Sequence, residues 1–131
     1  MSGEMSLEII LQNLQPVLLE EFYVFCSLPT EAYGALTHLL PLASVQEPEG
    51  LTLVLQAEDA RREGLHFHGE FRCIRLEVHS SLESVGLTAV ISTALAQEGI
   101  SANLLAGAHH DHVLVPASRA SDAMGVLQEL S

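Results

Sequence analysis

A chain of 131 residues, of which 48% are hydrophobic, can bury one core or two small ones, and this composition is typical of a soluble globular protein. The formal net charge is −12, and all five basic residues are arginines. Nucleic-acid binding is not expected of such a chain, because affinity for phosphates requires clustered Lys and Arg. Without lysine, a Walker A loop and a Schiff-base site are excluded, since both need an ammonium group at a fixed place.

The apolar stretches are too short to cross a membrane, because charge or proline interrupts each one before the roughly 20 residues that a membrane-spanning helix needs. The opening residues MSGEMSLEIILQ contain none of the basic residues of a signal peptide. We therefore expect a cytoplasmic protein with no membrane partner. Cys26 and Cys73 lie in predicted strands without a CxxC motif, so we expect buried thiols rather than a disulfide or a metal site.

The first half of the chain predicts a mixture of helices and strands. The expected elements are a helix, a central strand, the two strands of a hairpin and a short helix, at residues 5–14, 18–28, 39–46, 51–56 and 57–65. Ser6 is the expected N-cap of the first helix, and Gly64 ends the short one. Apolar side chains alternate on both sides of the central strand, so we expect both of its faces to be covered.

The second half predicts a strand, a helix, two strands and a last helix. These elements are expected at residues 71–79, 87–98, 100–107, 112–117 and from 118 onward. The first of the two helices has the clearest pattern in the chain, with apolar side chains at helical spacing from Leu87 to Leu95 and Gly99 at its end.

A weak internal repeat relates the two halves. A shift of 60 residues lays residues 53–60 over 113–120, where aliphatic residues match aliphatic residues and alanine matches alanine. We therefore predict two repeats, 1–68 and 69–131. The first repeat has no long helix after its opening strand, and we expect the N-terminal helix to fill that vacant layer, which makes the first repeat permuted.

Motifs along nearly the whole chain resemble the ACT domain in its bacterial tandem form. The segments EFYVFCSLP and EPEGLTLVL resemble the first repeat, and HSSLESVGLTA, EGISAN and HDHVLVP resemble the second. The resemblance implies an α+β fold of two ferredoxin-like βαββαβ repeats, with an antiparallel sheet and helices on one face. It also implies an amino acid bound at a domain or subunit interface. The ACT repeats of eukaryotic cytosolic arginine sensors are similar too, and Val85-Gly86 stands where Pro-Gly is common in the family.

The loop 79–86 is the first candidate site. It joins a strand to a helix, so its backbone N–H groups and the positive end of the helix dipole form a seat for a carboxylate. Ser80 and Glu83 also have the spacing of a capping box, which leaves capping and ligand binding as alternatives. In ACT domains the glycine that matches Gly86 lies beside the ligand. The residues expected to hold the carboxylate are Ser80, Ser81, Val85, Gly86 and Leu87.

The segment 109–112, HHDH, is the second candidate site. Asp111 is the expected partner of a ligand's ammonium or guanidinium group, together with Asn103 on the preceding strand. His110 and His112 are two residues apart and are expected to face the same way on a strand, toward the ligand or toward a metal ion. A polar hairpin tip that binds nothing remains the simplest interpretation.

The sequence contains no complete catalytic set. A zinc site needs three or four protein ligands, and only His79, His109 or a second chain could complete one here, so we expect neither a metal nor another cofactor. No G-x-S-x-G elbow surrounds Ser80 and Ser81. We interpret the chain as a non-catalytic sensing module for a small molecule, with an amino acid as the expected ligand. Open sheet edges favour a homodimer. The alternatives are a metal-dependent hydrolase or lyase that uses HHDH, and a structural or adaptor ACT domain with a closed pocket.

Overall fold

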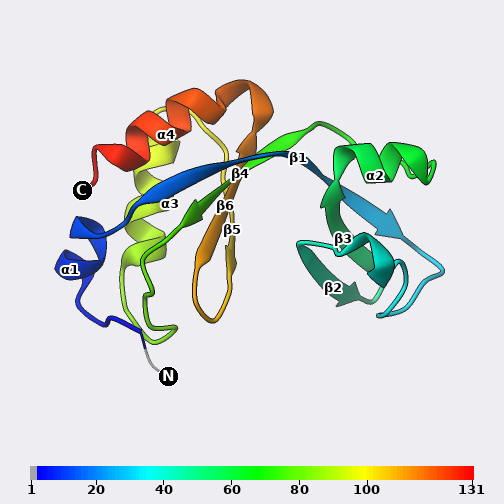
Figure 1. Cartoon of the computed structure of the whole chain (residues 1–131), viewed down its shortest axis with the longest axis horizontal. Coiled ribbons are helices and arrows are strands. Elements are labelled where there is room, and N and C mark those ends of the chain that lie inside the picture. Colours follow the sequence, from blue (N-terminus) through cyan, green and yellow to red (C-terminus); the bar gives the residue numbers. More distant parts are fainter. Residues whose placement is uncertain (1–2) are drawn as a thin grey trace. The chain divides into compact units, whose positions relative to one another are not determined.

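The computed structural model describes residues 3–131, which fall into two compact units (Figure 1). Residues 3–20 and 72–131 form one unit, which we call the terminal unit, and residues 21–71 form the other, which we call the central unit. The boundaries of these units differ from those of the predicted repeats 1–68 and 69–131. The residues up to Glu20, which we assigned to the first repeat, belong to the same unit as residues 72–131. The repeat boundaries stay a prediction from the sequence.

The helices and strands follow the predicted order. The helices are α1 (Leu7–Gln12), α2 (Ala57–Arg62), α3 (Leu87–Gln97) and α4 (Ala120–Gln128), with 3₁₀ turns η1 (Thr37–Leu39) and η2 (Ala117–Arg119). The strands are β1 (Pro16–Leu28), β2 (Ala43–Glu47), β3 (Gly50–Gln56), β4 (Phe71–Leu76), β5 (Asn103–Ala106) and β6 (Asp111–Pro116).

Strand β1 contributes to both units, because the division after Glu20 falls within it. The strand order is β2-β3-β1 in the central unit and β1-β4-β6-β5 in the terminal unit. In the central unit, β3 pairs antiparallel with both β1 and β2. In the terminal unit, β5 pairs antiparallel with β6. The expected α+β fold with an antiparallel sheet is confirmed.

The core of the terminal unit forms between α1, α3 and α4 and one face of β4 and β6. Its fully buried members include Ile10, Ile74, Ile91, Val113 and Leu127. Helix α1 therefore packs into the core of the unit that contains α3. The expectation that the N-terminal helix fills a vacant layer of the first repeat is wrong, because the apolar face of this helix finds its partners in the second repeat.

The core of the central unit is smaller. Side chains from β1, β3 and α2 form it, among them Val24, Leu53 and Ala60, and Leu39 of η1 packs against them. The expectation that both faces of the central strand are covered fails at Phe22, which is 44% exposed.

Local signals in the sequence were reliable. The Ser6 hydroxyl accepts a hydrogen bond from the Ile9 N–H at 3.4 Å, as expected of an N-cap. Gly64 follows α2 in the left-handed conformation that closes helices. Cys26 and Cys73 are buried free thiols, as predicted, and burial raises the pKa of Cys26. Within residues 3–131, no helix has the length and apolar character needed to cross a membrane.

Candidate functional site

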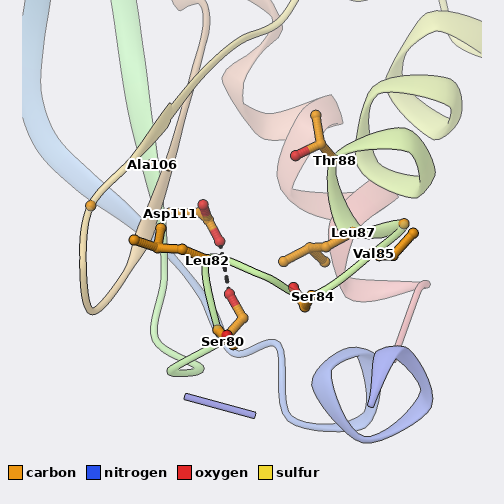
Figure 2. A pocket seen from close by; sticks show the side chains of 11 residues that line it. Ser80, Leu82, Ser84, Val85, Leu87, Thr88, Ala106 and Asp111 are labelled. Carbon is orange, nitrogen blue, oxygen red and sulfur yellow. Dashed lines mark hydrogen bonds between the residues drawn. The ribbon is translucent and has the colours of Figure 1, made fainter. Parts of the chain in front are cut away.

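A pocket of about 340 Å³ lies in the terminal unit beside the N-terminus of α3 (Figure 2). The loop between β4 and α3, the first turn of α3 and the turn between β5 and β6 form its walls. This volume is within the range of roughly 300 to 1,000 Å³ that is usual for small-molecule sites. The pocket is therefore large enough for a metabolite of modest size.

One wall is the start of α3. Gly86 is the N-cap residue, with φ of 105°, and no side chain caps the helix. The first backbone N–H groups of a helix lack intrahelical acceptors and lie at the positive end of its dipole, so this wall attracts a carboxylate. The capping box does not form: Ser80 bonds elsewhere, and the Glu83 N–H donates to the Ser81 hydroxyl at 3.1 Å.

The opposite wall carries the carboxylate of Asp111. The Ser80 hydroxyl donates a hydrogen bond to Asp111 Oδ2 at 3.1 Å, and Figure 2 shows the two side chains directed toward each other. Ser80 and Ser81 are each 9% exposed, so the protein fixes their positions. A positive helix end and a negative side chain thus share one small pocket, which suits a molecule that has both a carboxylate and a cationic group.

The structure brings together part of the predicted site. The predicted residues that line the pocket are Ser80, Ser81, Val85, Gly86, Leu87 and Asp111. Asn103, His110 and His112 do not line it. Asn103 pairs with Leu114 and His112 with Leu105, and strand alternation turns all four side chains away from the face on which Leu104 and Val113 contact the core. Asn103 and His112 therefore do not meet Asp111 at one site, contrary to expectation.

Some pocket residues were not identified from the sequence. They are Leu82, Ser84, Thr88, Ala106 and Gly107. Thr88 could have been identified from the sequence, because a hydroxyl in the first turn of a helix lies next to the helix N-terminus. Ala106 and Gly107 could not, because their place beside the pocket depends on the register of β5 against β6. Leu82 and Val85 are 70% and 84% exposed, so they give the pocket an apolar rim.

Three histidines lie close to one another, His79 in the loop after β4 and His109 and His110 at the tip of the β5–β6 hairpin. The ring centroids of His79 and His109 are 5.2 Å apart, and those of His109 and His110 are 6.5 Å apart. Burial lowers the pKa of His112, although a hydrogen bond with the Leu105 backbone acts in the opposite direction. Among the residues that the structure describes, no three His, Cys, Asp or Glu side chains form a group that could hold a metal ion.

Comparisons with known families and proteins agree with this fold. A family model described as "ACT domain" matches residues 2–72, and a second model with the same description matches residues 69–129. No curated protein sequence matches the chain.

Several solved structures are similar to this one. A Vibrio cholerae protein of unknown function, described as a possible transport protein, is 47% identical with a TM-score of 0.85, and the match covers 95% of this chain and 94% of that one. An Agrobacterium tumefaciens protein is 16% identical with a TM-score of 0.74, covering 90% and 89%. The ligand-free regulatory subunit of aspartate kinase from Thermus thermophilus is 10% identical with a TM-score of 0.70, covering 91% and 98%. The last two similarities concern the fold alone.

Proposed function

Because this chain belongs to the ACT domain family, we propose that it is a non-catalytic regulatory module whose pocket in the terminal unit binds an amino acid. The observation that carries the proposal is the opposition of the α3 N-terminus and the Asp111 carboxylate within one pocket. A free amino acid carries one carboxylate and one ammonium group, and each finds a partner of opposite charge there.

The binding chemistry follows from the two walls. The ligand's carboxylate accepts hydrogen bonds from backbone N–H groups at Leu87 and Thr88, where the helix dipole favours negative charge. Its ammonium group donates to Asp111 in charge-assisted hydrogen bonds. The Ser80 hydroxyl already donates to Asp111, so it orients the carboxylate before the ligand arrives. Leu82 and Val85 at the rim are left to contact the ligand's side chain.

A regulatory role is supported by similarity of fold. Two similar structures are described as the regulatory subunit of aspartate kinase from Thermus thermophilus and as a putative C-terminal regulatory domain of aspartate kinase from Porphyromonas gingivalis, and this chain shares their fold. In our proposal, the ligand changes the packing of this chain with a partner by binding one arrangement more tightly than another. Such a change in packing requires no covalent chemistry.

A second copy of the chain is the partner that we propose. Leu82 and Val85 present two exposed apolar side chains beside the pocket, and burying them in a homodimer would also shield the ligand from water. We propose the cytoplasm as the place of action, and neither nucleic acid nor membrane as partner, since the net charge of −12 disfavours anionic surfaces.

A thermal-shift screen against the twenty amino acids at millimolar concentration tests the proposal. An amino acid present at about 100 times its dissociation constant should stabilise the protein by about 2.7 kcal/mol, which raises the unfolding temperature by several degrees. Asp111→Ala should abolish the shift. A screen in which no amino acid shifts the transition would favour the adaptor alternative, and strong destabilisation by EDTA would favour a metal at the HHDH segment.

A further inference from the structure

The first described residues of the chain pair with the pocket loop. The Glu4 N–H donates to the His79 carbonyl at 2.8 Å, and the Ser81 N–H donates to the Glu4 carbonyl at 2.8 Å. Through these bonds Glu4 forms a parallel β-bridge with Ser80. The backbone is thus fixed on both sides of Ser80, the residue whose hydroxyl bonds to Asp111.

The same segment is anchored at its other end by α1. Glu4 Oε2 accepts hydrogen bonds at 3.0 Å from the N–H groups of Met5 and Ser6, and Ser6 then caps the helix. Ile10 of α1 is fully buried in the core of the terminal unit. The position of Glu4 is therefore tied to the core as well as to the loop.

Close packing at two further points leaves this segment little freedom. A Cβ atom at Gly3 would lie 2.6 Å from both the His79 carbonyl oxygen and the Ser80 carbonyl carbon, so any side chain there must displace backbone. At the far end of the loop, a Cβ atom at Gly86 would lie 3.1 Å from Leu7 Cδ2. Residues 3–7 therefore contact the start and the end of the loop 79–86.

From these contacts we propose that residues 3–7, which we call the N-terminal brace, are a positioning element of the pocket. The brace contacts the loop: it sets the backbone path that directs Ser80 toward Asp111, and it packs beside Gly86 at the start of α3. For its effect on a ligand this inference rests on the proposed function, whereas its effect on the loop does not depend on any ligand. By linkage, a ligand that requires the braced loop also orders the brace.

Gly3→Ala is the variant that detaches the brace with the smallest change. The control is Gly125→Ala, because a Cβ atom at Gly125 in α4 has nothing within 4 Å. Amide hydrogen exchange is followed by mass spectrometry in the absence of ligand. In Gly3→Ala we expect exchange over residues 79–86 to accelerate about tenfold or more, with residues 21–71 unchanged, because local opening costs less than global unfolding. Glu4→Pro, which lacks the N–H that donates to His79, should give the same pattern.

The ligand measurement uses the amino acid that gives the largest thermal shift. Its dissociation constant should rise about fivefold or more in Gly3→Ala and stay unchanged in Gly125→Ala, while the ligand-free unfolding temperature of Gly3→Ala falls only slightly. Unchanged exchange over 79–86 in both brace variants would overturn the inference, as would faster exchange spread evenly over the chain. If no amino acid binds, the exchange result alone decides on the brace, and only the proposed function fails.

Discussion

The two repeats end alike and begin differently. Strand β3 with α2 and strand β6 with η2 and α4 follow the same pattern, in which aliphatic strand residues and one helical alanine are buried: Leu53, Leu55 and Ala60 in one repeat, Val113, Val115 and Ala120 in the other. This shared pattern builds sheet and core in both units. The two strands differ at their first matching position, where β6 has Asp111, which lines the pocket, and β3 has Leu51.

The two repeats differ most in the segment that follows the opening strand, β4 in one repeat and β1 in the other. After β4 the chain forms the loop 79–86 and then α3, a helix of 11 residues. After β1 it forms only the 3-residue turn η1, flanked by Leu36 and Leu40 in the left-handed conformation. A long helix supplies a dipole and a set of N–H groups for a carboxylate, and a short turn does not. The repeats share their architecture, and the pocket is formed where they differ: by the loop 79–86, by the start of α3 and by Asp111 of β6.

Removing a core side chain from α3 should have the largest effect. Ile91 is fully buried, and the central unit has no helix at the corresponding place. Ile91→Ala should lower the free energy of unfolding by about 2 to 5 kcal/mol, because it leaves a cavity in the core. Urea unfolding measures the change. A loss below about 1 kcal/mol would mean that α3 is not a main support of the terminal unit.

Two glycines in the left-handed region sharpen the comparison between the units. Gly86, at φ of 105°, starts α3, and Gly64, at φ of 69°, follows α2. Replacing either by alanine should cost about 1 to 2 kcal/mol of unfolding free energy, because a Cβ atom is strained in this conformation. Only Gly86→Ala should also reduce the thermal shift given by an amino acid. Equal ligand shifts in the two variants would place the binding site elsewhere.

The pH dependence of stability should reside in the terminal unit. Burial lowers the folded-state pKa of His112 below the usual pKa of histidine, about 6.5, so the unfolded chain binds more protons as the pH falls through this region. Stability is therefore fully present above about pH 6.5 and is lost as the pH falls toward the lowered pKa. Thermal unfolding between pH 8 and pH 5 measures it.

His112→Gln is the control for this pH effect, since it should flatten the curve over that range. Glu77 adds a separate loss of stability at lower pH, because its hydrogen bond with Arg75 holds the pKa of Glu77 below its usual range. A curve that His112→Gln leaves unchanged would show that another group is responsible.

The smallest expected effect concerns the strained turn of the central unit. Leu40 has φ of 52° and is 85% exposed, so it bears backbone strain without burying its side chain. Leu40→Asn should raise the free energy of unfolding by up to about 1 kcal/mol, because asparagine tolerates this conformation. Differential scanning calorimetry would detect the gain as a higher unfolding temperature. A decrease would show that the Leu40 side chain contributes to packing.

The elements and the family could be predicted because their signals are local. Helical spacing located α3, alternation located β4, and the acidic turn located the β2–β3 hairpin. The place of α1 could not be predicted in this way. Its apolar face fits either unit, and only the core around Ile10 decides between them.

The candidate site was predictable on the loop and much less so on the strands. The carboxylate seat follows from a strand, a loop and a helix in sequence. The other wall depends on which face of β6 each residue occupies, and Asp111 and His112, adjacent in sequence, lie on opposite faces. A register between two strands is not encoded in any single short segment, so the sequence alone does not show which residues of β5 lie beside Asp111.

The most direct test locates the ligand on the chain. The amino acid that gives the largest thermal shift is titrated into ¹⁵N-labelled protein, and the amide resonances are followed by NMR. We expect the largest changes on Ser81, on Gly86 through Thr88, and on Gly107 and Asp111, which lie around one pocket. Changes centred on residues 21–71 would contradict it, because the ligand would then bind the unit that lacks the long helix.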